Sequence, residues 1–240
     1  MVHVQKKNGE IRICIDFHNL NQGSNKDNYP VLSIEEVLQS VSSSQMLSLL
    51  DGFSGYNQIL VSHRNQLKTT FRTKWGTYAH RKMPFGLINV GATFQRVMDI
   101  AFWGLIKKSV VIYLDEVTVY SKDKKYHMHH LMEVFDCCHK FGISLNPKKS
   151  VFGVTEGKIL SFIISKEDIM IDPERTQAIK QLLPHKHKKS MQFFLGKINF
   201  VQRFISDFAQ IVKPLKDLVN KDVECEWGLK QEEAFEHIKE

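Results

Sequence analysis

Three acidic residues stand at the ends of apolar stretches, where their charges are costly. Asp115 and Glu116 interrupt VVIYLDEVTVY, a run of β-branched and aromatic residues at positions 110–120, and Asp51 ends MLSLLD. Ionised carboxylates avoid apolar surroundings, and carboxylates that cluster repel each other unless a cation lies between them. Oxygen ligands of this kind suit Mg²⁺ or Mn²⁺, and two such ions about 3.5–4 Å apart support phosphoryl transfer. The three residues therefore indicate either a two-metal site or unrelated acids that cap strand ends.

The segments around these acids predict how they are positioned. The two apolar runs on either side of Asp115 and Glu116 leave almost no spare residues, so we expect a β-hairpin with both acids at its tip. Asp-Glu is a poor two-residue turn, because Asn-Gly or Asp-Gly is preferred there, and a site that breaks a local rule is often functional. If the strand that ends at Asp51 joins the same sheet, Asp51 and Asp115 meet at one edge although they are 64 positions apart (115 − 51).

The rest of the chain alternates short strand patterns with helical ones. A hairpin is expected near the start, where Asn8-Gly9 supplies the turn, with Ile11, Ile13 and Ile15 on a buried face. Ser33 is expected to cap a short helix with a capping box. Further helices are expected in GATFQRVMDIAFWGLI, KDKKYHMHHLMEVFDCCHKFG, DPERTQAIKQLL and SMQFFLGKINFVQRFI. Hairpins are more evident than βαβ units, so the sequence predicts an α+β fold with antiparallel strands.

Composition narrows the class of protein. The 240 residues are 42% hydrophobic and 25% charged, which argues against disorder. The formal charge of +7 is a weak sign of a polyanionic partner. The four cysteines form no CxxC pair, which favours a reducing intracellular setting, cytoplasmic or nuclear. Neither a signal peptide nor an apolar run of membrane-spanning length is present in the sequence, so no membrane association is expected.

The histidine-rich segments do not predict a metal site. His127 and His130 share one helical face of HMHHLMEVFDCCHKF, but a second pair of ligands is not available beside them. We therefore expect a solvated helix face there and no zinc. The basic segment PHKHKK is compatible with a localisation signal or with a linker that faces phosphates.

Several motifs in order along the chain resemble those of reverse transcriptases. YLDEVTVYS resembles their Tyr-Leu-Asp-Asp motif, LLDGFSGYNQI their first aspartate motif, MPFGLINVGATFQRVM the next block, and FGVTEGKILSFIIS the primer-grip region. DPERTQAIKQL and FLGKINFVQRFI resemble the thumb of gypsy-type long-terminal-repeat retrotransposon enzymes. Order and spacing match from residue 2 to the end. The chain is thus similar to the reverse transcriptase region of a retrotransposon pol polyprotein.

This resemblance implies a right-hand polymerase in which an antiparallel palm sheet is backed by helices. It implies template-directed nucleotidyl transfer, with a primed RNA or DNA template, deoxynucleoside triphosphates and two Mg²⁺ (or Mn²⁺) ions. Ribonuclease H and integrase domains would adjoin the chain in the full polyprotein. The implied regions are fingers at 1–25 and 59–89, palm at 26–58 and 90–165, thumb at 166–213, and a truncated connection or ribonuclease H-like segment at 214–240.

The resemblance also implies roles for single residues. Asp51 and Asp115 would bridge the two ions, and Glu116 would supply the third carboxylate. The ions would activate the primer 3′-hydroxyl and neutralise charge on the phosphates. The implied nucleotide-binding residues are Lys6, Lys7, Arg12, Tyr56, Phe85 and Gly86, of which Tyr56 would reject a ribose 2′-hydroxyl by collision. The implied template and primer contacts are Gln95, Tyr113, Ser161 and Phe162.

The sequence departs from the family pattern at several of these positions. Glu116 stands where an aspartate is expected, and its extra methylene lengthens the side chain by about 1.5 Å. Ser161-Phe162 replaces Gly-His, Gly91 a proline and His18 an arginine. We therefore expect impaired catalysis. The alternatives are a relic that only binds nucleic acid, and an unrelated metal-dependent nuclease, which would cleave rather than extend a primer.

Overall fold

The computed structural model describes residues 2–5, 9, 11–182, 187–219 and 227–239. The chain divides into two compact units, residues 1–160 with 164–169, and residues 161–163 with 170–240.

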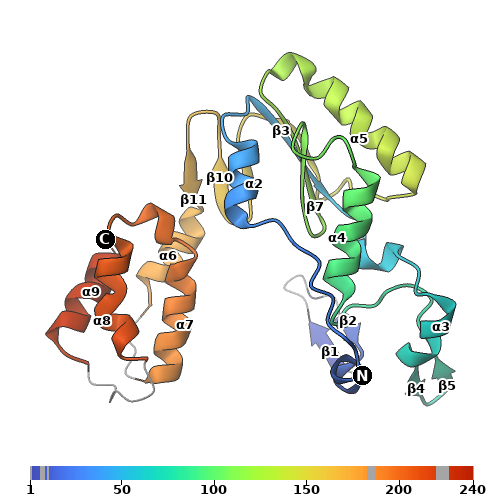
Figure 1. Cartoon of the computed structure of the whole chain (residues 1–240), viewed down its shortest axis with the longest axis horizontal. Coiled ribbons are helices and arrows are strands. Elements are labelled where there is room, and N and C mark those ends of the chain that lie inside the picture. The colour runs from blue at the N-terminus through green and yellow to red at the C-terminus, as the bar shows by residue number, and fades with distance from the viewer. Residues whose placement is uncertain (1, 6–8, 10, 183–186, 220–226, 240) are drawn as a thin grey trace. The chain divides into compact units, whose positions relative to one another are not determined.

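The first unit is built around a four-stranded antiparallel sheet in the order β6-β7-β3-β8. Two small hairpins, β1–β2 and β4–β5, lie outside this sheet. Figure 1 shows β3 and β7 alongside α4 and α5. The strands are β1 (Val2–Gln5), β2 (Ile11–Cys14), β3 (Met46–Asp51), β4 (Phe71–Thr73), β5 (Gly76–Tyr78), β6 (Val110–Tyr113), β7 (Glu116–Ser121), β8 (Val151–Val154) and β9 (Gly157–Ile159). The helices are α1 (His18–Gln22), α2 (Ile34–Val41), α3 (His63–Gln66), α4 (Val90–Ala101) and α5 (His127–Phe141).

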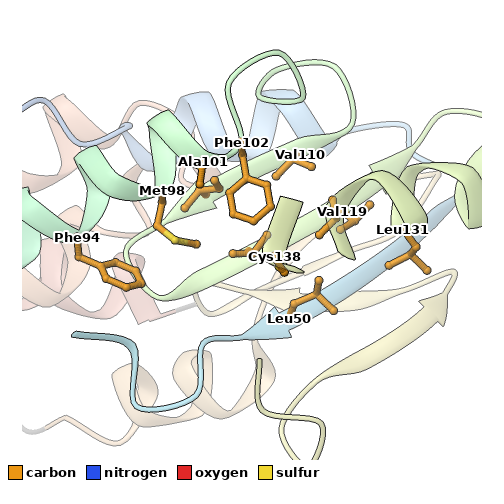
Figure 2. Packing of buried hydrophobic residues seen from close by; sticks show 12 residues of the cluster. Leu50, Phe94, Met98, Ala101, Phe102, Val110, Val119, Leu131 and Cys138 are labelled. Atoms are coloured by element: carbon orange, nitrogen blue, oxygen red, sulfur yellow. The ribbon is translucent and has the colours of Figure 1, made fainter. Parts of the chain in front are cut away.

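Two helices cover one face of this sheet. Because side chains alternate along a strand, Leu50 of β3 and Val119 of β7 point to the same face and join one buried cluster. Figure 2 shows Phe94 and Met98 of α4 and Leu131 of α5 packed over these strands. Asp51 and its pairing partner Glu116 point to the opposite face of the sheet. The burial of Leu50 and Val119 on one face therefore also determines the direction of these acids.

Local signals in the sequence account for most of these elements. Ser33 caps α2 by accepting a hydrogen bond from the Glu36 amide, and the Glu36 side chain accepts one from the Ser33 amide. Gly142 ends α5 in the left-handed conformation (φ +65°). The expected capping box, the end of α5 at Gly142 and the strand that ends at Asp51 are confirmed.

Other details of the expected fold are wrong. Ile11 is 68% exposed, so it does not lie on a buried face of the first hairpin. The stretch GKILSFIIS, whose apolar residues predict a single strand, forms two, because Leu160 and Ser161 both have positive φ and interrupt it. His127 does not lie on a solvated helix face: it is only 2% exposed and contacts the hydroxyl groups of Ser48 and Ser121.

The second unit is mainly helical and has its own core. It contains β10 (Phe162–Ile164) and β11 (Ile169–Ile171), which are neighbours in a small sheet, with parts of both strands assigned to the first unit. The helices are α6 (Pro173–Lys180), α7 (Lys188–Asn199), α8 (Phe208–Asp217) and α9 (Leu229–Lys239). Asp172 caps α6 by accepting from the Glu174 amide. Residues of all four helices form one buried cluster.

The α+β class with antiparallel strands is confirmed. The expected boundary between residues 213 and 214 falls inside α8, and residues on both sides of it share the second core. In the part of the chain that the structure describes, no helix has the length and apolarity needed to cross a bilayer.

Candidate active site

The turn of the acidic hairpin lies one residue earlier than its sequence suggests. Strand β6 ends at Tyr113 and β7 begins at Glu116, which pairs with Tyr113, so the turn consists of Leu114 and Asp115. Leu114 has φ +56°, the left-handed conformation in which glycine is usual. The expected Asp115–Glu116 tip is therefore wrong by one residue, because Leu114 adopts the turn conformation and Glu116 remains in the strand.

Pairing of β3 with β7 brings the third acid to this turn. Asp51 lies directly opposite Glu116 in the antiparallel register. The Gly52 amide donates to the carbonyl of Asp115 over 3.0 Å. The prediction that Asp51 and Asp115 meet at one sheet edge is thus confirmed. Asp51 and Glu116 also share a face of the sheet, opposite the face covered by α4 and α5.

Glycines give Asp115 its space. A Cβ atom on Gly55 would lie 3.2 Å from the Cβ of Asp115, closer than side chains normally approach. A Cβ on Gly52 would lie 3.4 Å from the Asp115 carbonyl oxygen. The two glycines of LLDGFSGYNQI therefore allow the loop after β3 to pack closely under the turn.

The electrostatics of the site reflect crowded negative charge. Removal of part of its hydration, together with the charges of Asp115 and Asp51, raises the pKa of the Glu116 carboxyl even though Glu116 has solvent access. The Lys149 ammonium lies 3.4 Å from Oδ2 of Asp51 and partly offsets this charge. A cavity of about 340 Å³ adjoins the same sheet face, and its lining includes Asp51, Glu116, Lys149, Glu156 and Lys158.

Two of the expected nucleotide-binding residues contact each other, and one of them, Tyr56, lies near Asp115. The ring of Tyr56 packs edge-on against that of Phe85, with centroids 5.2 Å apart, and against Phe94 at the same distance. Burial, with a smaller contribution from Asp115, raises the pKa of the Tyr56 hydroxyl. Gly86, next to Phe85, has φ +99°. Burial and these contacts hold the Tyr56 ring in one place beside the acidic turn.

The expected template and primer residues are distributed differently. Tyr113 is half-buried at the end of β6. Gln95 is only 1% exposed and lies under the turn, where its Oε1 accepts from the Leu114 amide over 3.1 Å. Ser161 and Phe162 belong to the second unit, and Phe162 is fully buried between Phe200 and Phe204. The side chains of Gln95 and Phe162 are therefore placed for packing and not for surface contact.

The structure describes only part of the basic cluster expected on the first hairpin. Lys6 and Lys7 lie outside the described residues. Arg12 pairs with Val4 in the β1–β2 hairpin, and only its backbone is described. Their nucleotide-binding roles stay predictions.

Sequence reasoning missed Lys149 and the buried position of Gln95. Lys149 follows Asn146-Pro147 in the stretch LNPKKS and is 98 positions from Asp51. No local pattern connects two residues so far apart, because their contact depends on how β8 pairs with β3. The hydrophobic spacing of α4 did indicate that one of its faces is buried, and Gln95 lies next to Phe94 on that face.

Among the described residues, no group of three or more His, Cys, Asp or Glu side chains converges closely enough to hold a metal ion. The donor set at the hairpin nevertheless fits a hard divalent cation. It consists of three carboxylates, and the pKa of Glu116 is raised by burial first and then by the neighbouring charges of Asp115 and Asp51. A cation would relieve the repulsion between these charges.

The known proteins that are similar to this chain are longer polyproteins. The retrovirus-related Pol polyprotein from transposon opus of Drosophila melanogaster is 34% identical over 89% of this chain, which covers 21% of that protein. The polyprotein from transposon gypsy of the same organism is 30% identical over 95% of this chain. The transposon Tf2-3 polyprotein of Schizosaccharomyces pombe is 28% identical over the whole chain. The chain spans about a fifth of the length of these relatives.

Solved structures show the same fold at lower sequence identity. The foamy viral protease-reverse transcriptase in complex with double-stranded DNA matches 99% of this chain with a TM-score of 0.89 and 21% identity, and 42% of that chain is covered. Its complex with an RNA/DNA hybrid matches with a TM-score of 0.82. The family model for reverse transcriptase (RNA-dependent DNA polymerase) matches residues 4–164. The α+β fold is thus that of a polymerase, and the chain belongs to the reverse transcriptase family.

Proposed function

We propose that this chain synthesises DNA on an RNA or DNA template as part of a retrotransposon polyprotein. The observation that carries the proposal is the register of β3 and β7, which sets Asp51 opposite Glu116 beside the Asp115 turn. Three carboxylates at one sheet edge suit phosphoryl transfer with divalent metal ions. Family membership and the likeness to polyproteins support the same function.

Asp51, Asp115 and Glu116 are the residues that would hold two Mg²⁺ or Mn²⁺ ions. When bound, the ions supply activation of the primer hydroxyl and neutralisation of phosphate charge. The chain's own contribution is to fix the carboxylates: hydrogen bonds of the sheet hold Asp51, and the hydrogen bond from the Gly52 amide holds the backbone of Asp115. Lys149 now pairs with Asp51, and a bound cation would take over this pairing with the Asp51 carboxylate.

Nucleotide and strand contacts complete the proposal. Tyr56 and Phe85, in contact with each other, would support the sugar and base of an incoming deoxynucleoside triphosphate. Lys6, Lys7 and Arg12 would hold its triphosphate, and Gly86 would allow the close approach of backbone to nucleotide. Tyr113 and Ser161 would contact primer and template. Adjacent ribonuclease H and integrase domains in the complete polyprotein belong to the same proposal, which the length of the relatives supports.

Primer extension tests the proposal directly. The purified chain is incubated with a primed RNA or DNA template, deoxynucleoside triphosphates and either Mg²⁺ or Mn²⁺. We expect slow incorporation, and we expect Glu116→Asp to increase it by roughly 10- to 100-fold, because a carboxylate misplaced by about 1 Å costs on the order of 10² in rate. Asp115→Asn is the matched control, which should abolish incorporation.

Each other outcome argues against the proposal in a defined way. If the chain binds primed template but neither it nor the Glu116→Asp variant incorporates nucleotides, the chain is a binding relic. If Mg²⁺ produces cleavage of the template and no extension, the site is that of a nuclease.

A further inference from the structure

Gln95 makes an unusual set of contacts for a polar residue of α4. It is only 1% exposed, and its amide oxygen accepts a hydrogen bond from the Leu114 amide over 3.1 Å. Its amide nitrogen donates to Oδ1 of Asp99 over 3.0 Å and approaches the carbonyl oxygen of Ile112 at 3.4 Å. Only one orientation of the amide satisfies all three partners, because the oxygen accepts and the nitrogen donates.

The contact with Leu114 falls on the most constrained point of the hairpin. Leu114 has φ +56°, a conformation that a branched non-glycine side chain adopts at a cost in free energy. Such a conformation persists only where surrounding contacts determine it. The hydrogen bond from Gln95 is a contact of that kind, and the next residue in the chain is Asp115.

Gln95 is itself held from behind. The second carboxylate oxygen of Asp99 accepts from the hydroxyl of Tyr29 over 2.8 Å. The guanidinium of Arg96 lies 4.6 Å from the centroid of the Tyr29 ring and forms an ion pair with Asp27 at 2.8 Å. The polar chain therefore runs from Tyr29 through Asp99 and Gln95 to the backbone of the turn. A glutamate at position 95 would place a second carboxylate against Asp99, and a leucine would leave the Leu114 amide without its acceptor.

We propose that Gln95 is a positioning residue, which fixes the Leu114–Asp115 turn through the chain Tyr29–Asp99–Gln95 and thereby sets the place of the catalytic carboxylates. The side chain does not contact the template. The structural part of this inference stands on the contacts alone. Its consequence for catalysis rests on the proposed function.

Hydrogen exchange tests the structural part without any need for activity. In Gln95→Leu we expect the amides of residues 110–120 to exchange at least 10-fold faster, while those of β3 change little. Met98→Ala is the matched control, because Met98 is equally buried on α4 and packs in the apolar cluster without a polar contact to the turn. It should lower global stability without selective exchange in the hairpin. Equal exchange of the hairpin in the wild-type chain and Gln95→Leu overturns the inference.

Kinetics separates positioning from template contact. We expect Gln95→Leu to lower kcat for single-nucleotide incorporation by roughly 10- to 100-fold, with an unchanged KM for primed template. A template contact would instead raise that KM and leave kcat unchanged, which overturns the inference. An inactive wild-type chain together with an inactive Glu116→Asp variant would contradict the proposed function and leave the exchange result to decide the inference.

A double substitution provides the sharpest control. Gln95→Glu alone keeps an acceptor for the Leu114 amide but places two carboxylates together, so hairpin protection should fall. Adding Asp99→Asn reverses the amide–carboxylate pair: the new carboxylate accepts from both the Leu114 amide and the new side-chain amide. We expect the pair to regain most of the hairpin protection and of kcat. If the double variant is no better than Gln95→Glu, the polar chain does not act as proposed.

Discussion

The space around Asp115 is set by the absence of a side chain on Gly55. A methyl group there would lie 3.2 Å from the Asp115 Cβ and 3.7 Å from the Phe94 ring. Catalytic carboxylates must be held within about 0.5 Å of their working geometry. A change of one methyl group beside the acid is therefore large on the scale that matters for catalysis, although it is small for folding.

For Gly55→Ala we expect incorporation to fall roughly 10-fold, because Asp115 must shift by a few tenths of an ångström to avoid the new methyl group. Gly23→Ala is the control: the nearest atom to a Cβ there is 3.8 Å away, so neither rate nor stability should suffer. Incorporation rates and urea midpoints of both variants provide the comparison. Equal rates for Gly55→Ala and the wild-type chain would show that the turn has room to spare.

Helix α5 is attached to the sheet by a polar contact as well as by its apolar face. His127 contacts one serine from each of the paired strands β3 and β7. Its Nε2 lies 2.7 Å from the Ser48 hydroxyl, and its Nδ1 lies 2.8 Å from that of Ser121. Ser121 also contacts His130 over 2.8 Å. Burial, and to a lesser extent His130, lowers the pKa of His127 below its usual range. The neutral imidazole is thus the form that fits this contact.

Stability should therefore decrease as the solution becomes acidic. Below a pH of about 6.5 the unfolded chain binds a proton at His127 that the folded chain resists, so the free energy of unfolding falls until the lowered folded pKa is reached, by at most about 1.4 kcal/mol per pH unit for this group. Urea midpoints between pH 8 and pH 5 measure this slope. His127→Gln should flatten it, and His129→Gln, an exposed neighbour on α5, should not. Equal slopes in the two variants would assign the pH dependence elsewhere.

Elements with strong local signals were predictable from the sequence, and most features determined by distant contacts were not. The capping box at Ser33 and the glycine after α5 act within a few residues of the chain. The Leu114 turn violates local preference, and the acceptor for its amide comes from Gln95 of α4, 19 positions away. The burial of His127 likewise depends on hydroxyls from two strands. The meeting of Asp51 with Asp115 could be predicted because apolar strands end at both, whereas the Lys149 contact had no such sign.

The described part of the chain contains two hydrophobic cores, one in each unit. Phe162 is fully buried in the second unit, where its ring stacks on Phe200 at 4.9 Å, and the Arg175 guanidinium lies 3.7 Å from the Phe200 centroid. Proteins with separate cores open region by region, each with its own free energy. Damage to one core therefore need not reach the other.

Phe162→Ala should destabilise the second unit by about 3–5 kcal/mol, the usual cost of such a cavity. Hydrogen exchange should rise in α7 and stay unchanged at residues 110–120. Phe193→Ala is the control, because Phe193 lies on α7 and is 61% exposed. This variant should change exchange in neither region. Simultaneous loss of protection in both regions would mean that the two units unfold as one.

The net charge of +7 belongs to the chain as a whole and suits a polyanion. If primed template binds as proposed, the logarithm of its affinity should fall linearly with the logarithm of salt concentration, by about 0.9 for each phosphate contact on duplex DNA. Fluorescence anisotropy between 50 and 200 mM salt, roughly the range in which such effects are large, measures the slope. A duplex analogue with an uncharged backbone should bind weakly at every salt concentration. A flat response with DNA would contradict binding through phosphates.

The pairing of β3 with β7 has a consequence for how a retroelement copy decays. A slip of one residue would turn every side chain of a strand to the opposite face, so the register that buries Leu50 and Val117 is also the one that sets Asp51 opposite Glu116. Mutations that preserve folding must preserve this register. A copy released from selection on its activity would thus keep its carboxylates in line for as long as it folds, and would lose function first through changes of side-chain length.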